Sequence, residues 1–397
     1  MNSRIYLDNA ATSFPKPAAV HSAMSRYATE LGASPGRGAY AEAREGGRIL
    51  TECRELLCRL FGGEDPNHVI FTLNASDALN LAIHGLVRPG DHVVTTWFEH
   101  NSVLRPLSRL SETDHVEVTR VECDPATGLV DPDDIRRAVR PRTRLVVVVH
   151  GSNVTGTLQP VGEIGRITRE RGIPFLVDAA QSAGHVGLDV RAAGIDLLAF
   201  PGHKGLLGPL GTGALYIRPG IEQELRTVRE GGTGSASDRD IQPDWLPDRF
   251  EPGSHNALGI AGWLEGVRYI LEHGIDQIRQ HEERLMRTML DGLDGIPGLR
   301  VYGPRTLAER VGVFSVRLGG FSDPQALSAR LERDFGILTR SGLHCAPLAH
   351  RTIGTADSGG TTRFSLGPFV TERDVGFAVE ALGALAREPE RARASAE

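Results

Sequence analysis

The sequence contains very little lysine. Only Lys16 and Lys204 are lysines among the 44 residues that are Lys or Arg, so the other 42 are arginines. Arginine supplies positive charge as well as lysine does, but it cannot supply a primary amine that loses its proton and forms Schiff bases with carbonyl compounds. Lys204 stands in a glycine-flanked turn, "FPGHKGLLGP". It is either a remaining surface lysine or a reactive amine, and its rarity alone leaves both possibilities open.

Cysteine is also scarce, and the four cysteines are too scattered for a disulfide framework in a chain of this size. We therefore expect reduced thiols. Cys53 and Cys58 are five residues apart in "ILTECRELLCRLF", which places them about 140° apart around a predicted helix, so that they cannot share a metal ion. No other group of Cys and His residues has the spacing of metal ligands. We expect no metal site.

Long apolar runs and common nucleotide-binding motifs are absent as well. No run of about 18 apolar residues occurs, and the first residues lack the apolar core of a signal peptide, so we expect a cytoplasmic protein without a membrane partner. The net charge of -6 comes from interleaved acidic and basic residues, which argues against nucleic acid as a partner. Neither a G-x-G-x-x-G motif after a strand nor a G-x-x-x-x-G-K-[ST] motif is present, so NAD and ATP lose their usual support.

What the sequence does contain is a regular alternation of short apolar runs and helical patterns from about residue 45 to 300. Runs that are apolar on both faces, separated by crossover helices, predict a mostly parallel sheet covered on both sides. We expect a large α/β domain over 21–260, a smaller α+β domain over 261–390 and a frayed tail over 391–397. The strands predicted for the central sheet are residues 68–73, 91–97, 115–121, 144–150, 173–179, 196–201 and 213–218.

Polar residues cluster where these strands end, which is the edge at which α/β sheets bind ligands. Ala75 and Ser76 open a predicted helix whose free N–H groups could cradle a phosphate, although Ser76 could instead cap the helix. Asp178 leaves a buried strand, so it either faces a protonated ring nitrogen or caps a helix. His100 either stacks on an aromatic cofactor or is structural. Asn153 follows another strand and could reach a ring hydroxyl.

Together with the amine of Lys204, these groups are the ones that pyridoxal phosphate requires. From "IYLDNAAT" to "TTRFSLG", nearly the whole chain resembles the class V aminotransferase family, in its cysteine desulfurase and selenocysteine lyase branch. The most specific part is "GHKGLLGPLGTGALYI". The resemblance implies a fold type I pyridoxal-phosphate enzyme with a seven-stranded sheet, a homodimer, and an N-terminal segment 1–20 that lines the active site.

The resemblance also assigns roles to individual residues. Lys204 would carry the cofactor, His100 would stack on the pyridine ring and Asp178 would hold the ring nitrogen. The further cofactor-binding residues would be Ala75, Ser76, Asn153, Gln181, His203 and, in "FEPGSHN", Ser254, which would reach the phosphate of the neighbouring subunit. Substrate binding would fall to Asn9, Ala10, Arg340 and Arg363, with the Arg363 guanidinium suited to two-point binding of a carboxylate.

The segment "TRSGLHCAPLAH" resembles the family's R-x-G-x-H-C-A pattern, whose cysteine takes sulfur as a persulfide. The matching residues are Arg340, Gly342, His344 and Cys345. A thiolate with histidine and arginine neighbours can attack a substrate sulfur, so this assignment is chemically sensible. The alternative is that Cys345 is a small buried apolar residue.

The resemblance implies removal of sulfur from L-cysteine, or of selenium from L-selenocysteine, to leave L-alanine, with a thiol or an acceptor protein collecting the sulfur. Two alternatives stay open: transamination, epimerisation or C–S lysis with Cys345 as a bystander, or a catalytically idle protein that binds a partner. The chain departs from the family pattern at two positions. Pro201 stands where Ser or Thr is frequent, which removes a hydroxyl and an N–H from the phosphate site, and Ser254 stands where Thr is common.

Overall fold

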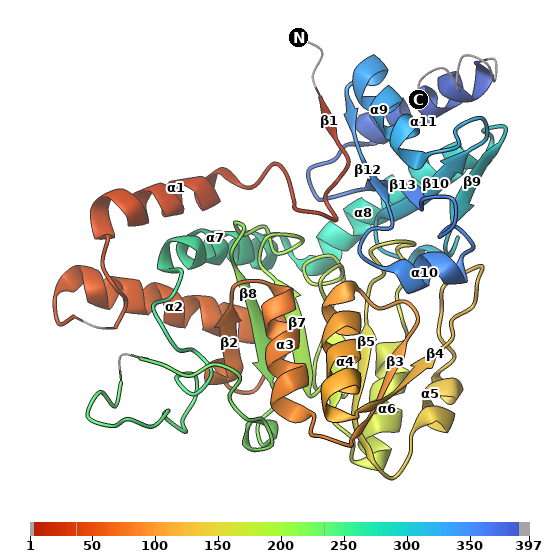
Figure 1. Cartoon of the computed structure of the whole chain (residues 1–397). Helices are drawn as coiled ribbons and strands as arrows, with labels where there is room; N and C mark the ends of the chain where they lie inside the picture. The colour runs from red at the N-terminus through yellow and green to blue at the C-terminus, as the bar shows by residue number, and fades with distance from the viewer. Residues whose placement is uncertain (1–3, 37, 234, 389–397) are drawn as a thin grey trace.

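The computed structural model describes residues 4–36, 38–233 and 235–388, and these form two lobes (Figure 1). The larger lobe contains the central sheet and most of the helices. The smaller lobe contains the remaining helices and a four-stranded sheet. The frayed tail expected at 391–397 lies outside the described residues.

The larger lobe is built around a seven-stranded sheet with the order β2-β8-β7-β6-β5-β3-β4. Only β8 runs antiparallel to its neighbours, so the sheet is mostly parallel, as predicted. Each of the seven predicted strands corresponds to one observed strand. These strands are β2 (Val69–Thr72), β3 (His92–Thr96), β4 (Glu117–Val121), β5 (Thr143–Val149), β6 (Phe175–Asp178), β7 (Leu197–Pro201) and β8 (Gly213–Ile217).

The two faces of this sheet belong to two different hydrophobic clusters, because side chains alternate along a strand. On β5, Val146 and Val148 join one cluster, whereas Leu145 and Val147 join the other. Burial of each such side chain contributes about 1.5–3 kcal/mol. Helix α1 (Ala18–Arg26) packs on α7 (Ala257–His273). The helices that cover the sheet are α7, α2 (Ala41–Leu60), α3 (Ala75–Leu86), α4 (Asn101–Asp114), α5 (Pro132–Ala138) and α6 (Val161–Arg171).

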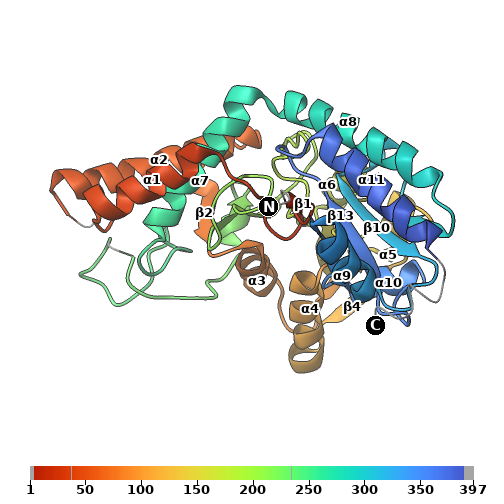
Figure 2. The same cartoon turned by 90° about the horizontal axis from the view of Figure 1, so that it is seen from above.

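The smaller lobe packs helices against a four-stranded antiparallel sheet of order β12-β13-β10-β9. Helices α8 and α11 run along this lobe side by side in Figure 2, and they contact each other. The strands of the lobe are β9 (Leu299–Tyr302), β10 (Val313–Leu318), β11 (Ile337–Leu338), β12 (Arg340–Gly342) and β13 (Thr361–Ser365). Its helices are α8 (Ile275–Asp294), α9 (Pro324–Phe335), α10 (Pro347–Thr352) and α11 (Glu372–Arg387).

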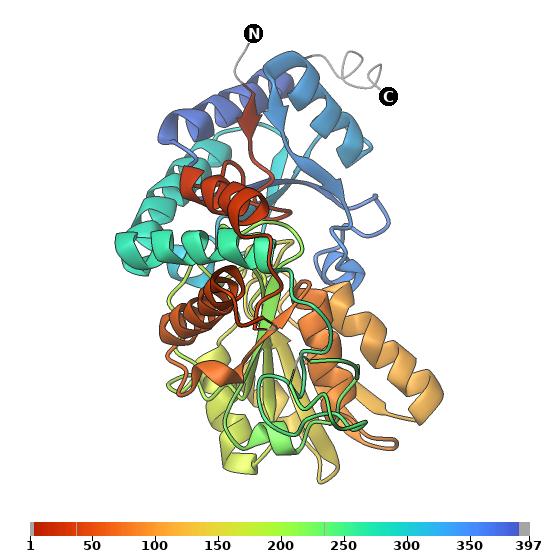
Figure 3. The same ribbon diagram turned by 90° about the vertical axis from the view of Figure 1, so that its left-hand side faces the viewer.

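The N-terminal segment crosses from one lobe to the other. Strand β1 (Ile5–Tyr6) pairs in parallel with β11, so the chain begins on the smaller lobe and reaches α1 on the larger one (Figure 3). This crossing places residues 7–16 between the lobes, where the carboxyl ends of the central strands also lie. Among the described residues, no helix is both long and apolar enough to span a membrane.

The boundary between the hydrophobic cores of the two lobes lies within α8 rather than at its start. Helix α7 packs on α1 and α2, and its side chains Trp263 and Ile270 belong to the core of the larger lobe. Ile278 on α8 still joins that core, whereas Leu285, two turns further on, joins the core of the smaller lobe. A division of the chain between residues 260 and 261 would cut α7, and the domain boundaries stay a prediction.

Candidate functional site

A cavity opens at the carboxyl ends of β3, β5, β6 and β7 and at the start of α3. It brings together eight of the nine residues that the sequence assigned to cofactor binding. The polar residues in its lining are Asn74, Ser76, His100, Ser102, Asn153, Asp178, Gln181, His203 and Lys204, with Ala75 and Pro201 beside them. The roles of these residues stay predictions, but their convergence is a property of the fold.

Lys204 and Asp178 are the two ionisable groups that define the centre of the cavity. Asp178 is the last residue of β6, and Lys204 lies in the turn that follows β7. Burial lowers the pKa of Lys204 to about 8, and the negative charge of Asp178 opposes that shift. Burial raises the pKa of Asp178, against the effects of a hydrogen bond from the Ala180 N–H (2.9 Å) and of the Lys204 charge. The lysine is therefore close to having a neutral, nucleophilic amine near neutral pH.

Close backbone packing holds the two turns that carry these groups against each other. Gly184, in the turn after Asp178, has φ of +84°, and a Cβ there would lie 2.2 Å from the carbonyl oxygen of Gly205. A side chain at Gly184 is therefore excluded both by conformation and by space. The two glycines fix the distance between the segment after Asp178 and the segment that carries Lys204.

His100 is both a structural and a cavity-lining residue. Its Nδ1 accepts a hydrogen bond from the Ser102 N–H (3.1 Å) and so caps α4. Burial lowers the pKa of His100 to about 4, and the positive charge of Lys204 adds to the shift, so its ring is neutral. A neutral, fixed imidazole on the cavity wall suits stacking on an aromatic ring. His100 can therefore be a structural residue that caps α4 and also stack on an aromatic ring, the two roles that the sequence left open.

The start of α3 and the ring of His203 form the polar end of the cavity. Asn74 caps α3 by accepting a hydrogen bond from the Asp77 N–H (2.9 Å), and the first N–H groups of a helix have no partner within it. Ser76 Oγ lies 2.5 Å from Ser102 Oγ, a link that the sequence did not predict. The buried Nδ1 of His203 has no hydrogen-bond partner among the described residues. Burial lowers the pKa of His203 to about 4, so its ring is neutral.

These groups fit pyridoxal phosphate. The helix N-terminus and the unpaired His203 nitrogen suit an anionic phosphate, and the buried carboxylate of Asp178 suits a protonated ring nitrogen. The enclosed amine of Lys204 suits the aldehyde. Pro201 lines the same cavity and offers neither a hydroxyl nor an N–H. Among the described residues, no group of three or more His, Cys, Asp or Glu side chains could hold a metal ion.

Arg363 lies buried beside this cavity, on β13. Its Nη1 donates to the carbonyl oxygen of Asn153 (3.2 Å), and its Nη2 pairs with Asp8 Oδ1 (2.6 Å). Its buried Nε has no partner among the described residues, so the guanidinium retains a donor for a ligand. The sequence analysis did not identify Asp8, although this residue stands inside the "IYLDNAAT" motif. Nothing in the motif indicates which arginine pairs with Asp8.

Asn9 and Ala10, predicted near the substrate, hold the N-terminal segment to its neighbours. Asn9 Nδ2 donates to the Ser365 carbonyl (3.1 Å), and its Oδ1 accepts from the Phe14 N–H (3.2 Å). The Ala10 carbonyl accepts from Gln181 Nε2 (2.9 Å). Gln181 therefore connects the cavity wall to the segment that carries Asp8.

Cys345 is the only exposed thiol among the four cysteines. It lies in the loop between β12 and α10, and it and His344 have φ of +58° and +48°, a left-handed conformation that is uncommon without glycine. The two carbonyl groups anchor the loop at the cavity wall, where the His344 oxygen accepts from Asn153 Nδ2 (2.5 Å) and the Cys345 oxygen accepts from the Asn101 N–H (2.8 Å). The Cys345 Sγ lies 3.7 Å from Arg340 Nη2.

The other three thiols are unsuited to this chemistry. Cys53, Cys58 and Cys123 are buried, and burial raises the pKa of each thiol, in the case of Cys123 to about 12. The prediction that Cys53 and Cys58 are packing residues agrees with their burial on α2. Exposure at an anchored loop thus distinguishes Cys345 from the rest.

A buried carboxylate beside the cavity escaped the sequence reasoning. Glu99 precedes His100, and its Oε1 accepts hydrogen bonds from Thr96 Oγ1 (2.7 Å) and the Val149 N–H (3.1 Å). Its pKa is raised to about 8, mainly by burial and to a smaller extent by the negative charge of Asp178. No local pattern signals such burial, because Glu99 lies in a polar turn of the sequence.

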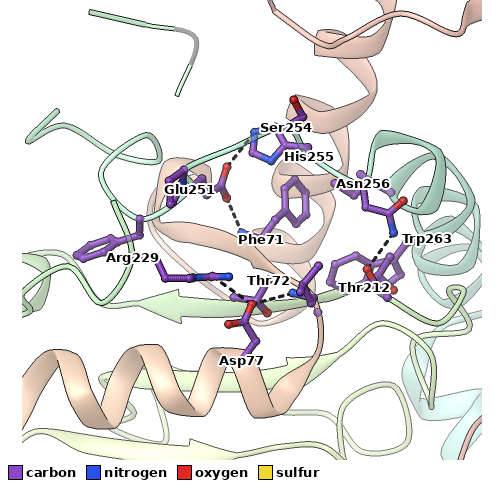
Figure 4. A pocket seen from close by; sticks show the side chains of 16 residues that line it. Phe71, Thr72, Asp77, Thr212, Arg229, Glu251, Ser254, His255, Asn256 and Trp263 are labelled. Carbon is purple, nitrogen blue, oxygen red and sulfur yellow. Dashed lines mark hydrogen bonds and ion pairs between the residues drawn. The ribbon is translucent and has the colours of Figure 1, made fainter. Parts of the chain in front are cut away.

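Ser254 is the one predicted cofactor residue that lies outside the cavity. It lines a second pocket next to the first, together with Leu73, Thr212, His255 and Asn256 (Figure 4). The described chain thus places Ser254 away from its own Lys204 site. Its predicted role concerned a neighbouring subunit, so it stays a prediction.

The chain is similar to known proteins over nearly its whole length. A family model described as aminotransferase class-V matches residues 5–377. A probable cysteine desulfurase of Methanothermobacter thermautotrophicus is 38% identical over 391 residues, which cover 97% of this chain and 96% of that protein. A cysteine desulfurase of Salmonella agona is 30% identical over 348 residues, which cover 86% of this chain and 84% of that protein. The apo structure of a cysteine desulfurase from Thermococcus onnurineus NA1 has a TM-score of 0.89 at 34% identity, covering 97% of this chain and 95% of the other.

Proposed function

This chain belongs to the aminotransferase class-V family, and on that premise we propose that it removes sulfur from L-cysteine, with pyridoxal phosphate as cofactor and Cys345 as sulfur acceptor. The observation that carries the proposal is the arrangement of Lys204 and Asp178 in one cavity, with the exposed Cys345 loop anchored on its wall. The relatives described as cysteine desulfurases support the choice of substrate.

Bound pyridoxal phosphate supplies an aldehyde that takes up amino groups and a cationic ring that withdraws electrons from the substrate Cα. Asp178 would hold the ring nitrogen protonated, and the neutral ring of His100 would lie on the face of the pyridine. The N–H groups of Ala75 and Ser76 and the His203 ring would bind the phosphate. Lys204, once released from the cofactor, would take the proton from the substrate Cα.

The substrate carboxylate would bind to Arg363. The guanidinium is buried and points two donors toward Asp8 and Asn153, and its Nε is unpaired among the described residues. A carboxylate that enters would compete with Asp8 for the guanidinium, and Arg340, which lies opposite Arg363 on the neighbouring strand β12, adds a second positive charge. Both arginines lie close enough to act electrostatically on Lys204, which supports one shared site for the substrate carboxylate and the amine.

The sulfur transfer is a displacement at sulfur. The Cys345 thiolate attacks the substrate sulfur, an S–S bond forms and the substrate Cβ–S bond breaks, with its electron pair returned to the carbon side. Proton uptake at that carbon leaves L-alanine, and the sulfur remains on Cys345 as a persulfide. An added thiol, or an acceptor protein, then attacks the persulfide and removes the outer sulfur.

We expect the enzyme to work as a homodimer. Exposed apolar side chains lie at or near the pocket that contains Ser254: Leu73 lines it, Leu210 precedes its residue Gly211, and Leu258 comes two residues after its residue Asn256. An apolar rim around a polar hydroxyl suits a second copy that brings its own phosphate there. Light scattering measures the mass, and Ser254→Ala should weaken cofactor retention without changing the mass.

The deciding experiment follows sulfide and L-alanine released from L-cysteine, with and without a reducing thiol, for the wild type and for Cys345→Ala. We expect equal amounts of both products from the wild type and a loss of about 100-fold or more in the variant. Leu343→Ala is the matched control, because Leu343 is an exposed side chain of the same loop that is not placed in the chemistry. It should retain wild-type rates.

Two results would contradict the proposal. If the wild type binds the cofactor and releases no sulfide, the substrate is another one, and L-selenocysteine and larger thioethers are the next to test. If Cys345→Ala keeps the wild-type rate on L-cysteine, Cys345 is not the acceptor of sulfur.

A further inference from the structure

The two lysines of the chain converge on the same peptide unit. Lys204 carries the candidate reactive amine, and Lys16 Nζ donates a hydrogen bond to the carbonyl oxygen of His203 (3.2 Å), the residue directly before it. The two lysines are 188 residues apart in sequence. The 42 other strongly basic positions of the chain are all arginine, so both of its lysines act on this one peptide unit.

The His203 carbonyl is surrounded by donors from the N-terminal segment. It accepts from the Ser13 N–H (3.0 Å), from Thr12 Oγ1 (3.0 Å), from Ser13 Oγ (3.2 Å) and from Lys16 Nζ. A carbonyl oxygen has two lone pairs, so four donors within hydrogen-bond distance exceed what an ordinary turn requires. The segment 12–16 therefore fixes the plane of the peptide that joins His203 to Lys204.

Lys16 forms no ion pair among the described residues. Its Nζ also donates to Ser13 Oγ (2.9 Å), and no carboxylate pairs with it among the described residues. Many arginines of the chain do pair with carboxylates, at the surface as well as within the protein. The compact ammonium of a half-buried lysine reaches a hydroxyl and a carbonyl together, whereas the wide, planar guanidinium of arginine favours two-point binding to a carboxylate.

The other end of the same segment is fixed to the smaller lobe. Leu7 N–H donates to the Leu338 carbonyl (2.9 Å), and Asp8 pairs with Arg363. Residues 7–16 thus run from the arginine that would bind the substrate carboxylate to the carbonyl next to Lys204. Lys16 is the last contact of this run.

We propose that Lys16 is a positioning residue for Lys204, which it holds in place through the carbonyl oxygen of His203. This inference rests on the proposed function, in that Lys204 is the residue that bonds pyridoxal phosphate. Lys16 touches neither the cofactor cavity nor the substrate arginine, so it acts only through the peptide that it holds. Without it, the amine of Lys204 would meet the aldehyde in the productive orientation less often.

The test measures how fast the cofactor-free protein captures pyridoxal phosphate. Capture is followed by the visible absorbance of the lysine-bound cofactor, and borohydride reduction with mass spectrometry locates the bond. Lys16→Met keeps the length of the side chain and removes its donors, Lys16→Arg keeps charge and donors, and Val20→Ala loosens the buried side of α1 without touching His203. We expect Lys16→Met to slow capture at Lys204 about tenfold, the effect of one charge-assisted hydrogen bond.

We expect Lys16→Arg to capture the cofactor faster than Lys16→Met and more slowly than the wild type, because it keeps a charged donor but its planar guanidinium cannot reach the hydroxyl and the carbonyl together. Val20→Ala should capture the cofactor at the wild-type rate although its melting temperature falls. In turnover, Lys16→Met should lower kcat and leave the KM for L-cysteine unchanged, since Arg363 is untouched.

The outcomes separate this inference from the proposed function. If the wild type takes up no cofactor at Lys204, the proposed function fails. If the wild type does so and Lys16→Met is equally fast, the inference is wrong. It is also wrong if Lys16→Arg is as slow as Lys16→Met, or if Val20→Ala is slowed as much for a similar loss of melting temperature, because the effect would then be general loosening.

Discussion

The amine of Lys204 should be reactive before any cofactor is present. Burial lowers its pKa from 10.5 to about 8. At pH 7 about one molecule in ten then carries the neutral amine, compared with about one in 3000 for an ordinary lysine, which is a gain of about 300-fold in nucleophile. This gain comes from the cavity alone, so it can be measured on the cofactor-free protein.

The scarcity of lysine makes the measurement clean. Trace labelling with acetic anhydride from pH 6 to pH 10, followed by mass spectrometry of the peptides, reports the protonation of Lys204 and Lys16 separately, because these are the only two lysine side chains. The labelling of Lys204 should reach its half-maximal rate near pH 8. A half-point near pH 10.5 would refute the argument from burial.

Two variants test the signs of the charges around Lys204. Asp178 raises the pKa of Lys204 and Arg340 lowers it, so Asp178→Asn should move the half-point to lower pH and Arg340→Gln should move it to higher pH. Arg300→Gln, on the distant strand β9, is the control and should leave it unchanged. Shifts of Asp178→Asn and Arg340→Gln in the same direction would refute the assignment of charges.

Three further predictions concern binding and stability. Arg363→Lys should raise the KM for L-cysteine about tenfold in steady-state kinetics and change kcat less, because lysine cannot bind a carboxylate at two points. In the folded protein, Glu282 raises the pKa of His185 above its ordinary value of 6.5, although burial of the ring opposes this shift. The pair therefore contributes its full stabilisation of the fold below pH 6.5, and this contribution is lost as the pH rises through the pKa of the folded protein. In urea unfolding, Glu282→Gln should therefore be less stable than the wild type by about 3 kcal/mol at pH 6, and the difference should shrink at pH 8.5. Arg54→Met should lower the unfolding free energy by about 3–5 kcal/mol, because it leaves Glu251 buried without its main partner. The double variant Arg54→Met and Glu251→Gln should lower the unfolding free energy by less than Arg54→Met alone, because no unpaired buried charge remains.

The sequence predicted those features that depend on local patterns. Strand β5 was expected at 144–150 and is observed at Thr143–Val149, because a run of valines buried on both faces needs no distant information. Asp178, His100 and Lys204 were expected together because each follows a strand of a parallel sheet, and such strands end at one edge. The cavity confirms that they meet.

Contacts between distant segments could not be predicted in the same way. Asp8 and Arg363 are 355 residues apart, and Lys16 and His203 are 187 apart. Nothing in either local sequence specifies the partner, since the pairing depends on how β1 joins the smaller lobe. Ser102 was missed because its link to Ser76 requires the relative positions of α3 and α4. The charge and hydrogen-bond partners of the site are thus set by tertiary structure.

The N-terminal segment makes both of these distant contacts, the Asp8–Arg363 ion pair and the hydrogen bond from Lys16 to the His203 carbonyl. Arg363 is buried, and a buried arginine without a partner would carry an uncompensated charge, which its pair with Asp8 compensates. On the proposed function, a substrate carboxylate that binds Arg363 would take over this role from Asp8, which lies only four residues before Thr12. Thr12, Ser13 and Lys16 hold the His203 carbonyl, so one short stretch of backbone joins the Asp8–Arg363 pair to the peptide next to Lys204. We therefore expect a bound substrate carboxylate to act on Lys204 through this segment, without a movement of one whole lobe against the other.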